Sequence, residues 1–151
     1  MYIVLNTKNL MWAGLILIFL FLAISTGCER DMRIKIDGKN PPTFTLSGSG
    51  DLVFLYLAEV HDNRPPSLED PDLWEIRPNG NNKISKLPSI TYGTVPQGFI
   101  QVTPASGAPP PLIEGKLYAV GGPNANANGG SIWFTIKGGR SVEVPKFSGA
   151  P

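Results

Sequence analysis

Residues 131–144 read SIWFTIKGGRSVEV, two runs of strand-forming residues on either side of a Gly-Gly pair. Three apolar side chains of the first run share one face by alternation: Ile132, Phe134 and Ile136. Gly138 and Gly139 suit a two-residue hairpin turn of the primed kind, because glycine tolerates positive φ. The second run is expected to return with Val142 and Val144 inward. The stretch therefore predicts an antiparallel hairpin with one buried face.

Similar short apolar runs occur upstream, separated by clusters of Gly, Pro, Asn and Asp. They cover residues 33–37, 43–47, 52–60, 73–77, 89–92, 99–103 and 116–121. The run 52–60 is almost wholly apolar and reads as a central strand. Past residue 28 there is no amphipathic helix of ten or more residues and no repeat period. This organisation predicts an all-β, antiparallel β-sandwich of about 7–9 short strands.

Composition narrows the function classes. The 151 residues include 13 Lys plus Arg and 12 Asp plus Glu, so the chain is nearly neutral. It lacks the excess of positive charge that is typical of nucleic-acid-binding proteins. One Cys excludes an internal disulfide and a Cys-based zinc site, and one His excludes a three-His zinc site. There is no Gly-x-Ser-x-Gly elbow, and the Gly-rich stretches lack a following helix. We expect no enzyme activity and no cofactor.

Before the strand region lies an apolar segment, residues 10–24, without a charged side chain. As a helix it would span roughly 22 Å, which is short of the ~30 Å hydrocarbon core of a bilayer. Lys8 precedes it and small residues follow it, the three-part pattern of a secretory signal peptide.

The residues Ser25-Thr26-Gly27-Cys28 resemble the lipobox of bacterial lipoproteins, although Ser25 stands where that family prefers Leu. The resemblance implies cleavage between Gly27 and Cys28. It also implies that Cys28 carries diacylglycerol, usually with a further acyl chain such as palmitate on its amine. Two or three chains anchor a protein stably in a membrane. Because Glu29 rather than Asp follows the Cys, the resemblance favours the outer over the inner membrane of a Gram-negative cell.

These readings divide the chain into four parts. Residues 1–27 form a lipoprotein signal peptide and 28–32 a lipidated tether. Residues 33–145 form the β-sandwich and 146–151 a frayed tail. Past Cys28, the four residues of the tether reach at most ~14 Å when extended. The domain is therefore expected close to its membrane.

Two features resemble the immunoglobulin-like and fibronectin type III-like sandwiches. Trp74 is expected inward on the strand after the long apolar one. The stretch Leu112 to Tyr118 resembles the tyrosine corner, in which a Tyr hydroxyl bonds the backbone of the preceding bend. The resemblance covers residues 41–145 and implies that Tyr118 shares an inward face with Val120. A jelly roll is the alternative fold.

An acidic loop, residues 61–72, is the strongest candidate for metal binding. Its four carboxylates are possible Ca²⁺ ligands: Asp62, Glu69, Asp70 and Asp72. Their spacing does not match an EF-hand. The alternative is an exposed loop kept soluble by its charge.

Surface aromatics suggest a possible binding face. Alternation places Trp133 on the polar face of its strand, where it could stack on a sugar or anchor a protein, with help from Tyr92. The alternative is that Trp133 packs under a neighbouring loop such as residues 104–111. The uncharged loop 124–128 lies where sandwich domains often bind partners, or it serves as a solvated linker.

We expect a lipid-anchored protein of the bacterial cell envelope with a non-enzymatic binding or structural role. Its partner would be an envelope protein or glycan, and the lipid anchor would hold the protein at the membrane. Two alternatives stay open: a carbohydrate-binding module and a Ca²⁺-dependent adhesin-like module.

Overall fold

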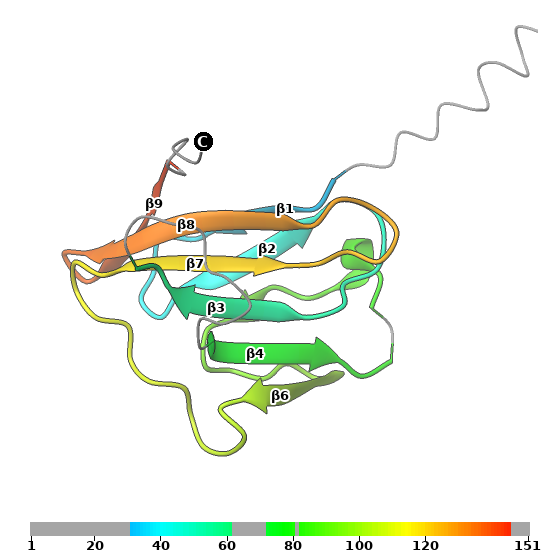
Figure 1. The fold of residues 1–151 in the computed structure, drawn as a ribbon, viewed down its shortest axis with the longest axis horizontal. Coiled ribbons are helices and arrows are strands. Elements are labelled where there is room, and N and C mark those ends of the chain that lie inside the picture. Colours follow the sequence, from blue (N-terminus) through cyan, green and yellow to red (C-terminus); the bar gives the residue numbers. More distant parts are fainter. Residues whose placement is uncertain (1–30, 62–71, 81, 146–151) are drawn as a thin grey trace, which may run out of the picture.

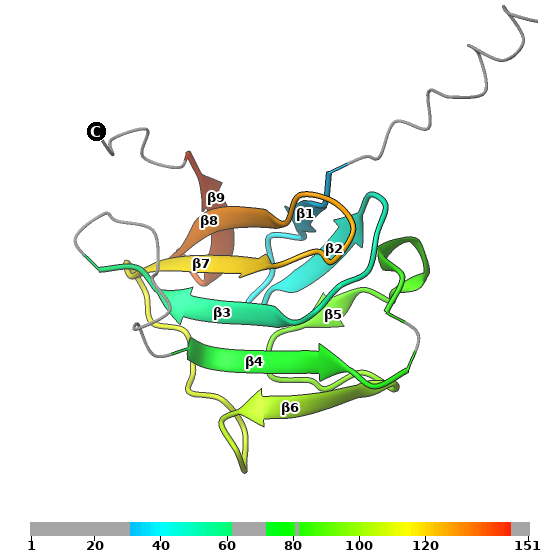
Figure 2. The ribbon, with the colours of Figure 1, turned by 45° about the vertical axis from the view of Figure 1, so that its right-hand side comes forward.

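The computed structural model describes residues 31–61, 72–80 and 82–145. These residues form two facing β-sheets (Figures 1 and 2). The strands are β1 (Arg33–Ile36), β2 (Thr43–Ser47), β3 (Leu55–Glu59), β4 (Asp72–Pro78), β5 (Ile90–Thr91), β6 (Phe99–Thr103), β7 (Leu117–Gly122), β8 (Gly130–Lys137) and β9 (Arg140–Val144). A single 3₁₀ turn, η1 (Ile84–Lys86), is the only helical element of the described part, and the sequence pattern did not predict it. None of the described helices is long and apolar enough to cross a membrane.

The smaller sheet has the strand order β1-β2-β5, and the larger has β6-β4-β3-β7-β8-β9. Every strand pair is antiparallel. Strand β3 lies between β4 and β7, as expected for a central strand, but it is shorter than the apolar run that predicts it. The expectation of an all-β, antiparallel two-sheet fold is confirmed.

The core lies between the two sheets. Phe44 of β2 meets Phe134 of β8 with ring centroids 6.0 Å apart, and Tyr118 of β7 lies 5.6 Å from Phe134. Trp74 is fully buried in this cluster, so its predicted inward position is confirmed. Tyr118 and Val120 share the same inward face, also as predicted.

Two ends of the sandwich are defined by β7. The long bend of residues 104–116 precedes Leu117, and the β7–β8 loop of residues 123–129 follows Gly122. The six residues of β7 separate these ends by about 17 Å. We call the end with the β7–β8 loop the base and the end with the bend the far end (Figure 1).

The described chain starts at the base. The backbone N–H of Met32 donates to the carbonyl of Asn128 (3.1 Å), and the Asn128 amide donates to the Asp31 carboxylate (2.9 Å). A Cβ on Gly130 would lie 2.4 Å from the Met32 carbonyl oxygen, so glycine is needed for this close approach. Met32, assigned by the sequence to the tether, is 3% exposed and belongs to the core. The sandwich therefore begins before residue 33.

The β7–β8 loop is held by its asparagine side chains. Asn124 Oδ1 accepts from the N–H groups of Asp51 (3.0 Å) and Asn126 (3.2 Å), while its Nδ2 donates to the Ser49 carbonyl (2.7 Å). Asn126 in turn donates to the Asp51 carboxylate at 2.6 Å. A Cβ on Gly50, whose φ is +90°, would collide with the Asn124 side chain. This loop is thus bonded to the β2–β3 connection and is not a solvated linker.

The Gly138-Gly139 turn forms as predicted, with φ of 60° and 69°. It pairs Lys137 with Arg140, which places Val142 opposite Thr135 and Val144 opposite Trp133. Directly opposed residues share a face, so both valines lie on the outer face and their predicted inward position is wrong. Ser141 takes the inward position instead and is buried. Val142 is 42% exposed.

Candidate functional site

The bend of residues 104–116 at the far end is held to the domain by hydrogen bonds with buried and half-buried side chains. The Tyr118 hydroxyl accepts from the backbone N–H of Ile113 (2.8 Å). Leu112, the residue before Ile113, packs into the core. The hydrogen bond expected of a tyrosine corner is therefore present.

The other half of the bend is held by Gln101 of β6. Its Nε2 donates to the carbonyls of Pro104 (2.8 Å) and Gly107 (2.9 Å). Its Oε1 accepts from the indole N–H of Trp74 at 3.0 Å. The buried Trp74 thereby fixes Gln101, and Gln101 fixes the bend.

Tyr92, a predicted member of the binding face, follows β5 and is 6% exposed. Its ring meets Trp74 edge-on at 5.5 Å, and its hydroxyl donates to the Pro110 carbonyl at 2.7 Å. Burial, with a smaller contribution from Tyr118, raises the pKa of Tyr92 to about 12. Its ring is therefore part of the packing under the bend and is not an exposed stacking surface.

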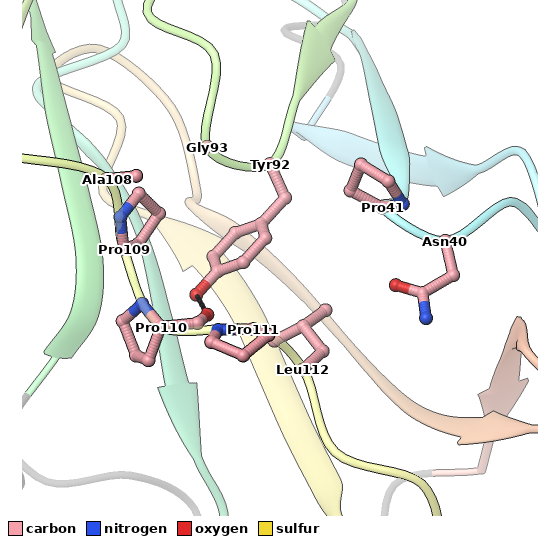
Figure 3. A pocket seen from close by; sticks show the side chains of 9 residues that line it. All are labelled: Asn40, Pro41, Tyr92, Gly93, Ala108, Pro109, Pro110, Pro111 and Leu112. Carbon is pink, nitrogen blue, oxygen red and sulfur yellow. Dashed lines mark hydrogen bonds between the residues drawn. The ribbon is translucent and has the colours of Figure 1, made fainter.

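A groove of about 310 Å³ opens between Tyr92 and the surrounding turns (Figure 3). The β1–β2 turn contributes Asn40 and Pro41, and the bend contributes residues 108–112. The Pro109 ring lies close to Gly93, at 3.5 Å from where a Cβ would stand. The lining contains no Asp, Glu, Lys, Arg or His. Such a groove suits an uncharged ligand or side chain.

Trp133 lies on the outer face of the larger sheet, as alternation predicted, but it is only 3% exposed. It forms a second, smaller cluster with Val60 and Ala119, against which Leu117 and Val144 pack. The predicted face of Trp133 is therefore right, and of the two possibilities left open for its ring, packing is the one observed. Alternation gives the face on which a side chain lies, but does not say what covers it.

The outer face carries a different aromatic cluster that the sequence pattern missed. Phe54 and Tyr56 are half-buried with ring centroids 6.3 Å apart, and the Arg77 guanidinium lies 5.7 Å from the Phe54 ring centre. Arg77 Nε bonds Glu75 Oε1 at 2.6 Å, and Glu75 is 8% exposed. The sequence does not indicate this cluster, because the run 52–60 is apolar on both alternating faces. Only the burial of Leu55 and Leu57 in the structure shows that Phe54 and Tyr56 lie on the outer face.

Most of the acidic loop lies outside the described residues, including Asp62, Glu69 and Asp70. Asp72 begins β4, and its side chain is not described. Within residues 31–61, 72–80 and 82–145, no three His, Cys, Asp or Glu side chains gather into a metal-binding group. The predicted Ca²⁺ ligands therefore stay predictions.

The proposed lipidation site, Cys28 with Gly27 before it, also lies outside the described residues.

At the far end, Glu59 bonds Lys116 at 2.6 Å and lies 3.9 Å from His61 Nδ1. This exposed ion pair ties the end of β3 to the start of β7.

Comparison with known proteins adds no assignment. No family model matches the chain, and no curated protein or solved structure is significantly similar to it.

Proposed function

We propose that the chain is a lipid-anchored protein of the bacterial envelope whose domain binds a partner and catalyses no reaction. The anchor rests on the lipobox-like residues 25–28. The observation that carries the proposal is the position of the groove relative to the start of the domain. Asp31 and Met32 are held at the base by Asn128, whereas the groove beside Tyr92 lies at the far end.

This arrangement suits an anchored binding domain. Only two residues lie between Cys28 and Asp31, and the three steps of chain reach about 10 Å when extended. A lipidated Cys28 would keep the base beside the bilayer and direct the far end away from it. A partner approaching from the aqueous side would then meet the groove and the bend first.

We also propose that the domain is immunoglobulin-like. Sheet β1-β2-β5 corresponds to strands A, B and E of that fold, and the neighbours β3-β7-β8 correspond to C, F and G. Tyr118 stands at the start of the strand equivalent to F, where the tyrosine corner of that fold belongs. Strands β6 and β9 would be additions at the two edges of the larger sheet.

Fatty-acid labelling tests the anchor. Cells given an alkyne-tagged fatty acid should label the wild-type chain and should not label Cys28→Ala, because no other thiol exists. The matched control is Ser25→Ala, which keeps the thiol and should retain the label. Label that persists in Cys28→Ala would contradict the proposal of a lipid anchor at Cys28.

A second candidate function, binding of an envelope glycan, is favoured by the outer-face cluster of Phe54, Tyr56, Glu75 and Arg77. Aromatic rings pack against the C–H face of a sugar, while planar charged groups bond its hydroxyls. On an envelope-glycan array, Tyr56→Ala should lose binding and Val142→Ala, a change at another exposed outer-face position, should keep it. Equal binding by both variants would remove this candidate.

A further inference from the structure

Residues 108–113 form an exposed, uncharged segment at the far end, which we call the proline strut. It reads Ala-Pro-Pro-Pro-Leu-Ile and belongs to no strand or helix. Each proline ring fixes φ near −65°, and each residue before a proline is pushed toward extended backbone. Ala108, Pro109 and Pro110 all precede a proline, so the sequence itself favours the polyproline II conformation here.

The burial pattern of the strut agrees with a helix of three residues per turn. Leu112 is buried in the core, and Pro109, three residues earlier, packs partly buried beside Gly93. Pro110 is exposed and so is Ile113, again three residues apart. Ile113 is 53% exposed, the highest value among the large hydrophobic side chains exposed in the described residues. One side of the strut thus faces the domain and the other faces solvent.

The strut is held rigidly at both ends and in the middle. Gln101 binds the Gly107 carbonyl just before it, and Tyr118 binds the Ile113 N–H at its end. Tyr92 binds the Pro110 carbonyl between them. A segment ordered in this way loses little conformational freedom when a partner binds it.

We propose that the proline strut is a docking ligand for a partner protein whose binding groove is lined with Trp or Tyr side chains. Exposed polyproline II segments are recognised by aromatic-lined grooves, in which proline rings pack against aromatic faces. No residue from Pro104 to Ile113 is charged, so packing rather than ion pairing would supply the affinity. Glu114, the carboxylate that directly follows the strut in the sequence, already accepts from the N–H groups of Gly138 (2.5 Å) and Gly139 (3.3 Å).

This inference names the partner chemistry for the proposed binding function and rests on that function for its biological setting. A partner that uses the strut would approach from the far end, opposite Asp31. The strut's own contacts with Tyr92, Gln101 and Tyr118 do not depend on the anchor.

The experiment is an NMR titration of the full chain in detergent micelles with ¹³C-labelled proline and isoleucine. The probe is N-acetyl-tryptophanamide, and N-acetyl-leucinamide at equal concentration is the aliphatic control. We expect saturable shifts of Pro110, Pro111 and Ile113 with the tryptophan probe alone. Pro111→Ala should lose this response, whereas Pro145→Ala, which changes an exposed proline elsewhere, should keep it.

Three outcomes would overturn the proposal: no saturable shift, equal shifts with the leucine probe, or an unchanged response in Pro111→Ala. The anchor is tested separately by labelling at Cys28. A chain that binds the probe but carries no lipid would end the envelope proposal and keep the strut. A lipidated chain that ignores the probe would do the reverse.

Discussion

The Tyr118 hydroxyl accepts a hydrogen bond from the backbone N–H of Ile113, five residues earlier, at 2.8 Å. Tyr118 is 1% exposed, so its phenol reaches this N–H from within the core. The bond thereby ties the exposed bend to the interior of the domain.

Removing this hydroxyl tests its contribution. Tyr118→Phe should lower the free energy of unfolding by about 1 kcal/mol, because the Ile113 N–H loses its acceptor. Denaturant unfolding followed by circular dichroism measures the change. Ile113→Ala keeps the N–H and removes only an exposed side chain, so it should cost less than about 0.5 kcal/mol. Equal stabilities of wild type and Tyr118→Phe would contradict this role.

Trp74 and Trp133 are both buried, but replacing them should lower the free energy of unfolding by different amounts. Trp74→Ala should lose on the order of 3–5 kcal/mol, since it removes a fully buried ring from the main core. It also deprives Gln101 of the indole N–H. Trp133→Ala should be clearly destabilising but cheaper, because its cluster is small and two of its neighbours are partly exposed. A Trp133→Ala protein as stable as wild type would show that the outer cluster contributes nothing.

Asn124 should be the most sensitive residue of the β7–β8 loop. Asn124→Ala loses three hydrogen bonds and should cost about 1.5–3 kcal/mol in unfolding free energy. Asn126→Ala loses a single exposed side-chain donor to Asp51 and should cost less than about 1 kcal/mol. Urea unfolding tests this expectation, and the midpoint concentration of Asn124→Ala should be lower than that of Asn126→Ala. A reversed order would mean that Asn124 does not organise the loop.

The raised pKa of Tyr92 predicts a loss of stability at high pH. The folded state retains the phenol proton to about pH 12, whereas the unfolded chain releases it near pH 10, the ordinary value. The contribution is therefore fully present below pH 10 and is lost as the pH rises from 10 to about 12.

Two measurements check this expectation. In an ultraviolet titration, Tyr92→Phe should remove an ionisation near pH 12 from the curve of the folded protein. In unfolding experiments, the same variant should show a weaker decline in stability over this pH range. A decline that is identical in wild type and variant would assign the effect to other groups.

Each strand of the structure matches a run predicted from the sequence, because strand alternation and turn residues act locally. The face on which Val142 and Val144 lie can also be derived from the sequence. A two-residue turn at Gly138-Gly139 requires Thr135 to pair with Val142, and Thr135 is on the outer face. The turn therefore couples the faces of the two strands, so that the face of one strand determines the face of the other.

Other features depend on contacts between distant segments, which no local pattern contains. Asn124 bonds Ser49, 75 residues away, and Asn128 bonds Asp31, 97 residues away. The groove beside Tyr92 is likewise assembled from three turns. Burial of Trp133 depends on Val60, which belongs to another strand region.

The attachment of Met32 and Asp31 to Asn128 has a mechanical consequence. Strand β1 starts at the base and runs toward the far end, where the proline strut lies. A tensile load between an anchor at the base and a partner on the strut would act along the strands. The hydrogen bonds between β1 and β2 lie perpendicular to the strands, so they would be loaded together in shear and would not open one at a time. The contacts of Asn128 would be strained first and would shield the start of β1 from peeling.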